Sequence, residues 1–145
     1  MILNSIYAFF ATLGLSVLFN ISKKHLFFTS FGGALAWFSY LLTLKYSNSN
    51  FFAYFAASVI AAVYSEIMAR VIKAPVTIFI ICSIIPLVPG GGMYNTMLEA
   101  IRGNISRFLT IGVQTLSIAG AIAAGIIFVS SLTKIFIIKN KKAYQ

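Results

Sequence analysis

The sequence predicts an all-α integral membrane protein of about five transmembrane helices, with a helix broken by proline and glycine at residues 86–92. Two observations carry this fold class. Of 145 residues, 60% are hydrophobic and 9% are charged, whereas a soluble domain has about 25% charged residues. The apolar residues also come in runs about as long as a bilayer-spanning helix. We therefore expect one transmembrane domain over residues 1–145, solvated by the lipid bilayer.

Three apolar runs in the first half of the chain match a membrane span in length. They cover Ile2 to Ile21, Phe27 to Leu44 and Phe51 to Met68. The first run lacks a basic segment before it and a clear small-residue cleavage site before Lys23, so we expect a retained helix rather than a signal peptide.

The fourth run, Val76 to Val88, is short and ends in Pro86-Leu87-Val88-Pro89 and three glycines. Prolines remove backbone donors, and glycines permit conformations that a helix does not use. We expect the helix to break there and a new helix to start near Met93, with Asn95, Glu99 and Arg102 on one face.

The fifth run, Phe108 to Ile138, is long enough to span with tilt or to extend past the headgroups. Five spans with an outside N-terminus place eight Lys and Arg residues inside and three outside, which agrees with the positive-inside rule. Four spans would reverse the bias. The inner set is Lys23, Lys24, Arg70, Lys73, Lys134, Lys139, Lys141 and Lys142, and the outer set is Lys45, Arg102 and Arg107.

Small residues recur at helical spacing, which lets helix backbones approach closely in a membrane. In the first helix the stripe also carries hydroxyls, which either line a path or hydrogen-bond a neighbouring helix, and we favour packing. The stripes are Ala8, Thr12, Ser16 and Asn20; Ala53, Ala57, Ala61, Ser65 and Ala69; and Ser117, Ala121 and Gly125.

Several function classes find little support. The net charge of +9 sits in short clusters between apolar runs, as in membrane-protein loops, so we expect no nucleic-acid partner. Cys82 is the single cysteine and His25 the single histidine, and no cluster suits a metal or a catalytic triad. His25, beside two lysines, is typical of an interfacial anchor. We expect no enzyme activity, no metal and no cofactor.

The break is the most informative segment. Unpaired amides within a membrane need protein or a watery cavity beside them, so we expect a buried, polar-lined place. A helix N-terminus preceded by glycine amides attracts a carboxylate, although a tight turn remains the alternative. The candidate substrate-binding residues are Pro89, Gly90, Gly91, Gly92 and Asn95.

Two acids are candidates for proton coupling, Glu66 and Glu99. An ordinary ion pair, of Glu66 with Arg70 and of Glu99 with Arg102, is the favoured alternative for each. If either acid lies within the membrane, a functional role for that acid becomes the default interpretation.

The segment from Ile85 to Met97, IPLVPGGGMYNTM, resembles the signature of the threonine/serine exporter family, ThrE. Ser65 to Arg70, SEIMAR, and Lys73 to Thr77, KAPVT, are also similar to that family. The length and five-helix plan resemble the small YjjB-type subunit, which corresponds to the C-terminal half of fused exporters.

This resemblance implies a bacterial cytoplasmic-membrane exporter of threonine and serine, or of succinate-like dicarboxylates, driven by the proton gradient as an antiporter. It also implies a larger YjjP-like subunit that carries the other membrane half. The alternatives are a homo-oligomeric membrane channel or assembly subunit and, least favoured, a membrane enzyme. Both substrate classes offer a carboxylate to the same helix end.

Overall fold

The computed structural model describes residues 1–142, with side chains up to Ile135. In this part of the chain all regular structure is helical. The elements are α1 (Ile2–Leu18), α2 (Lys23–Ser47), α3 (Asn50–Ile72), α4 (Val76–Ile84), the 3₁₀ turn η1 (Ile85–Leu87), α5 (Gly90–Ile101) and α6 (Ile105–Lys142).

Left-handed residues end the early helices. Asn20, Asn48 and Lys73 have φ of 54°, 50° and 55°, a conformation that terminates a right-handed helix. α1 therefore stops three residues before the predicted Ile21, whereas α2 and α3 run beyond their apolar runs at both ends. Hydropathy predicts the segment that lipid solvates. The backbone hydrogen bonds of α2 and α3 continue past that segment into polar residues, so these two helices are longer than their apolar runs.

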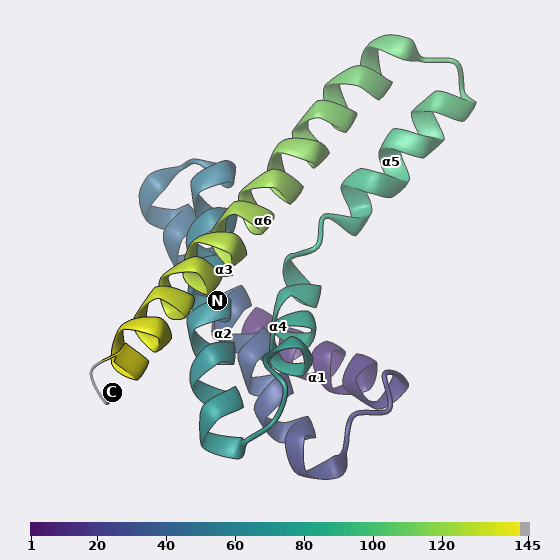
Figure 1. Cartoon of the computed structure of the whole chain (residues 1–145). Coiled ribbons are helices and arrows are strands. Elements are labelled where there is room, and N and C mark those ends of the chain that lie inside the picture. Colours follow the sequence, from purple (N-terminus) through teal and green to yellow (C-terminus); the bar gives the residue numbers. More distant parts are fainter. Residues whose placement is uncertain (143–145) are drawn as a thin grey trace.

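The helices are arranged as a bundle with a projecting hairpin. In Figure 1, α1 to α4 gather in one body, and α6 runs past it along α3. α5 packs on α6, and the two run side by side away from the body (Figure 1). The segment around the break therefore lies where the bundle and the hairpin meet.

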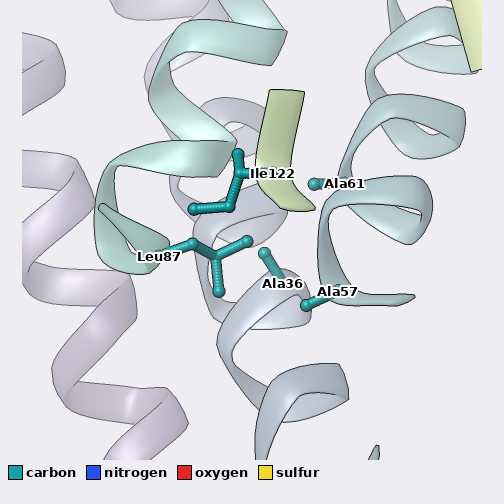
Figure 2. Packing of buried hydrophobic residues seen from close by; sticks show 5 residues of the cluster. All are labelled: Ala36, Ala57, Ala61, Leu87 and Ile122. Carbon is teal, nitrogen blue, oxygen red and sulfur yellow. The ribbon is translucent and has the colours of Figure 1, made fainter. Parts of the chain in front are cut away.

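The core sits where α2, α3, η1 and α6 converge. Figure 2 shows Leu87 and Ile122 directed at the small side chains of Ala36, Ala57 and Ala61. The three alanines are fully buried and Leu87 is 1% exposed. Because alanine lets backbones approach closely, two larger side chains suffice to fill the space between four elements.

The predicted five-segment plan is confirmed. α2, α3 and α6 are long and apolar enough to cross a membrane. The pair Val76–Leu87 and Gly90–Ile101, bent by 58°, counts as one broken span, and α1 is a shorter apolar helix. At about 1.5 Å per residue, the 17 residues of α1 span about 25 Å, close to the hydrocarbon thickness.

The small-residue stripes mark packing faces, as predicted, with two exceptions. All five members of the α3 stripe are buried, as are Ala8, Thr12 and Ser16 in α1. Asn20 is exposed because it lies beyond the end of α1, and Ser117 is exposed on α6. The tail lysines Lys139, Lys141 and Lys142 fall outside the described side chains, so their place in the charge count stays a prediction.

One glycine contact between α3 and α6 permits a direct stability test. A Cβ added to Gly125 would collide with the Ser58 hydroxyl and lie 3.0 Å from the Phe55 carbonyl oxygen, whereas a Cβ on Gly120 would meet nothing within 4 Å. We expect Gly125→Ala to destabilise the protein by about 1–3 kcal/mol through overpacking. Gly120→Ala should be neutral or stabilising by about 0.5–1 kcal/mol, because alanine favours helix more than glycine does. Thermal unfolding in detergent micelles measures both, and equal melting temperatures would contradict this α3–α6 packing.

Candidate functional site

The break is built from a 3₁₀ turn followed by a γ-turn. Pro86 lies in η1, where proline's missing donor is tolerated, and Leu87 anchors that turn in the core. Pro89 has φ −77° and ψ 56°, and the Gly90 amide donates to the Val88 carbonyl oxygen at 2.8 Å, which is the geometry of an inverse γ-turn. The chain thereby turns by 58° between two helices without a long loop.

α5 begins at Gly90, three residues before the predicted start near Met93. The glycines form its first turn because amides there need no intrahelical partner. The first helical bond runs from the Met93 amide to the Pro89 carbonyl oxygen, at 3.0 Å. No side chain caps the helix, so the Gly91 and Gly92 amides have no acceptor among the described residues.

The expectation of a buried break is wrong for this chain taken alone. Gly90 and Gly91 are exposed, and a Cβ on either would meet nothing within 4 Å. A cavity of about 330 Å³ lies beside the break. It is bounded by Val88, Pro89 and Met93 on one side and by α6 on the other. Thr115 is its one side chain with a polar atom. Gly90, Gly91 and Gly92 are not among the residues that line it.

Gly92 has a packing role that the sequence alone did not reveal. A Cβ on Gly92 would lie 2.5 Å from the Thr115 hydroxyl, and a Cβ on Gly112 would lie 3.3 Å from the Thr96 methyl. Thr96 and Thr115 thus each face a glycine on the other helix of the hairpin. Their hydroxyls donate to their own helices, Thr96 to Gly92 and Thr115 to Ile111, both at 2.7 Å. In the sequence, this contact was indicated by the spacing of Gly112 and Thr115, which places both residues on one face of α6.

Asn95 is exposed on α5 and does not line the cavity. Glu99, four residues further along α5, is 6% exposed, so the predicted face of Asn95, Glu99 and Arg102 is buried only at its middle member. The structure therefore brings Pro89, Gly90, Gly91 and Gly92 together in one turn and leaves Asn95 one turn away on the outer side.

Both candidate acids form the ion pairs that were their favoured alternative. Arg102 donates to Glu99 at 3.2 Å, and Arg70 donates to Glu66 at 3.1 Å. In each pair the carboxylate is the less exposed partner: the side chains of Glu99 and Glu66 are 8% and 15% exposed, and both arginines are exposed. Glu66 lies on α3, which shares no packing interface with α5, so the two acids belong to different parts of the fold.

Metal-ligating groups do not gather in the described part of the chain, where no three His, Cys, Asp or Glu side chains lie together. The chemistry that this site offers is consequently hydrogen bonding and the positive end of a helix dipole, beside an apolar cavity.

A family model described as Threonine/Serine exporter, ThrE, matches residues 4–132. That range contains the break, α5, both acids and α6 as far as residue 132. No curated protein and no solved structure matches the chain.

Proposed function

Because this chain belongs to the threonine/serine exporter family, we propose that it is the small subunit of a two-component secondary exporter for small carboxylate solutes. Family membership makes it a multi-pass membrane transport protein. The proposed solutes are threonine and serine or succinate-like dicarboxylates, exported across a bacterial cytoplasmic membrane in exchange for protons.

The single observation that carries the substrate assignment is that the amides of Gly91 and Gly92 find no acceptor among the described residues. They point out of the first turn of a 12-residue helix, where the aligned peptide dipoles amount to about half a positive charge. A carboxylate placed there accepts two hydrogen bonds, as anions do at helix N-termini. Discontinuous helices hold substrate carboxylates in this way in other transporters.

A cavity next to the break suits the rest of a small solute. It is about 330 Å³ in volume, and its lining, which includes Val88, Pro89 and Met93 of the break but not Gly91 or Gly92, is apolar except for Thr115. A partner that covered the break would exclude water from hydrogen bonds at the amides and strengthen them, because the local dielectric constant would fall. We propose Pro89, Gly90, Gly91 and Gly92 as the binding turn, with the Asn95 amide for polar groups of the solute.

The exposure of the break supports a partner subunit. Lipid cannot hydrogen-bond exposed peptide groups, so Gly90 and Gly91 need cover within the membrane. The outer faces of α5 and α6 also expose the amides of Asn95 and Gln114. We propose that a larger YjjP-like membrane subunit packs on this hairpin and closes the site.

Glu99 is the better placed of the two candidate proton-coupling residues. It is buried in the same hairpin as the binding turn, and its charge is balanced by an exposed arginine. An acid inside a membrane span is a functional candidate by default. Glu66 lies on a different helix and is the second candidate.

We expect efflux only from the two-subunit assembly. Cells that lack their own exporters are loaded with a threonine dipeptide or with succinate and express this chain with or without the larger subunit. Efflux that needs both proteins and stops with an uncoupler is the expected result, and the loaded solute that leaves identifies the substrate class. Equal efflux with this chain alone would instead support a homo-oligomeric channel.

A matched pair of variants at one position tests the free amide. Gly91→Pro removes the amide proton, and proline is tolerated in the first turn of a helix. Gly91→Ala keeps the proton and meets nothing within 4 Å. We expect Gly91→Pro to lower solute affinity about tenfold or more, since a hydrogen bond to a charged group contributes about 1.5–3 kcal/mol. Gly91→Ala should bind as the wild type does, and equal affinity of the two variants would exclude the amide as a ligand.

The charge count of eight against three supports an outside N-terminus and an inside C-terminus. A reporter that is active only in the cytoplasm should be active when fused to the C-terminus and silent when inserted beside Lys45. The opposite pattern would reverse the proposed orientation.

A further inference from the structure

An open apolar groove lies at one end of the four-helix body, and no residue of α5 or α6 lines it. Its volume is about 240 Å³. One wall is the loop between α1 and α2, and the other wall is α4. The lining residues are Phe19, Ile21, Thr77, Ile78, Ile81 and Cys82. We call this feature the α1–α4 groove.

The groove is open to the surroundings of the bundle and is almost wholly apolar. Phe19 and Ile81, on its two walls, are 59% and 48% exposed, whereas Cys82 is 1% exposed and forms the floor. Thr77 is the one lining side chain with an oxygen atom. Exposed apolar surface of this kind marks a contact with a membrane or with another protein. The chemistry of the groove therefore suits an acyl chain.

Two lysines stand beside the groove at the start of α2. Lys23 follows the groove residue Ile21 by two positions, Lys24 comes next, and both are exposed. The same turn of α2 carries His25, whose ring packs edge-on against Phe79 with the ring centroids 6.0 Å apart. Phe79 lies in the part of α4 that lines the groove. The first turn of α2 therefore brings two positive charges to this place.

The loop between α3 and α4 brings a third lysine. Lys73 is exposed, has a φ of 55° at the end of α3, and precedes the groove residue Thr77 by four positions. The Tyr64 hydroxyl of α3 donates to the Phe28 carbonyl oxygen at 2.8 Å, which ties the second half of α3 to the first turns of α2. The α1–α2 and α3–α4 loops consequently lie at the same end of the four-helix body (Figure 1).

The three lysines keep their charge uncompensated in the described part of the chain. The ion pairs there are two, and neither includes a lysine. Glu66 is the only acid in α1 to α4, and Arg70 holds it at 3.1 Å. Lys23, Lys24 and Lys73 therefore form a cationic rim next to the apolar groove.

We propose that the α1–α4 groove is a binding site for an anionic phospholipid, whose acyl chain fills the groove while its phosphate contacts the cationic rim. Basic pockets between membrane helices bind the head groups of anionic lipids in this way. A zwitterionic lipid fits less well, because the rim repels its ammonium group. In the proposed orientation this end of the bundle faces the cytoplasmic leaflet, where anionic lipids attract basic segments. The lipid site does not depend on the exporter function.

Two basic residues elsewhere in the chain provide a matched control. Lys45 lies in the last turn of α2 and Arg107 in the first turn of α6. Both are exposed, and neither forms an ion pair with a described residue. The double variants Lys23→Gln/Lys24→Gln and Lys45→Gln/Arg107→Gln each remove two positive charges. General attraction between a basic protein and an anionic lipid predicts the same loss of affinity for both variants, whereas the groove predicts a loss only for the first.

Native mass spectrometry of the purified full chain measures lipid affinity without a transport assay. The chain is held in detergent micelles, and phosphatidylglycerol or phosphatidylcholine is added. We expect phosphatidylglycerol to bind about tenfold more tightly, the scale on which a few basic residues attract an anionic lipid. Lys23→Gln/Lys24→Gln should bind the two lipids about equally, while Lys45→Gln/Arg107→Gln should keep the wild-type ratio. Equal affinities in the wild type, or the same ratio in both variants, would overturn the proposal.

A second pair of variants tests the groove itself. Ile81→Trp places a large side chain in the groove. Val71→Trp places one on the last turn of α3, where Val71 is 70% exposed and does not line the groove. We expect Ile81→Trp to abolish the preference for phosphatidylglycerol and Val71→Trp to retain it, although both keep every charge. Equal preference in the two variants would exclude the groove as the site of the lipid.

Other occupants of this end of the bundle predict different results. Glycerol phosphate carries the head group without acyl chains, so we expect it not to displace phosphatidylglycerol. Displacement would assign the lysines to a soluble anion and overturn the lipid site. A second copy of the chain seated in the groove would appear as a dimer that Ile81→Trp dissociates and that carries no preferred lipid, which would also overturn it. Absence of efflux from the two-subunit assembly would refute the exporter function and leave the lipid site unaffected.

Discussion

The contact of Leu87 with Ala36, Ala57 and Ala61 is the interaction on which the rest of the structure depends. Without a hydrophobic driving force between helices in lipid, close packing holds a membrane bundle together, and close packing needs small residues. The three fully buried alanines provide that room, and Leu87 with Ile122 fills it. Leu87 also ends η1, so the core fixes the point at which the fourth helix stops.

The position of the proposed binding turn follows from that anchor. Pro86 and Leu87 are held in the body, the γ-turn at Pro89 redirects the chain, and α5 leaves along α6. Glycine serves two purposes in the next three residues. Gly92 admits Thr115 of α6, while Gly91 leaves its amide open. No side chain caps the start of α5, as is also true of α1, α2, α3 and α4, and the binding of an anion at this start is our proposal.

Buried serine hydroxyls show how one residue type takes different roles in the same membrane domain. Ser58 and Ser65 return their hydrogen bonds to their own helix and act only as small packing residues. Ser83 is equally buried but makes no such bond in the described chain. The difference between these serines lies in hydrogen bonding rather than in burial.

The sequence by itself determined the membrane fold, the broken fourth span and the i,i+3 and i,i+4 ion pairs of the two acids, because hydropathy, proline and glycine placement, and helical spacing are local properties. It also predicted the small-residue faces of α1 and α3. Only the tertiary structure decided that Glu99 is buried while Asn95 is not, that Gly92 accommodates Thr115, and that Ser83 packs against Gly32. These features depend on which helix faces meet and at what register. Helical periodicity in the sequence determines neither, because both are decided by how small residues distant in the sequence pack together.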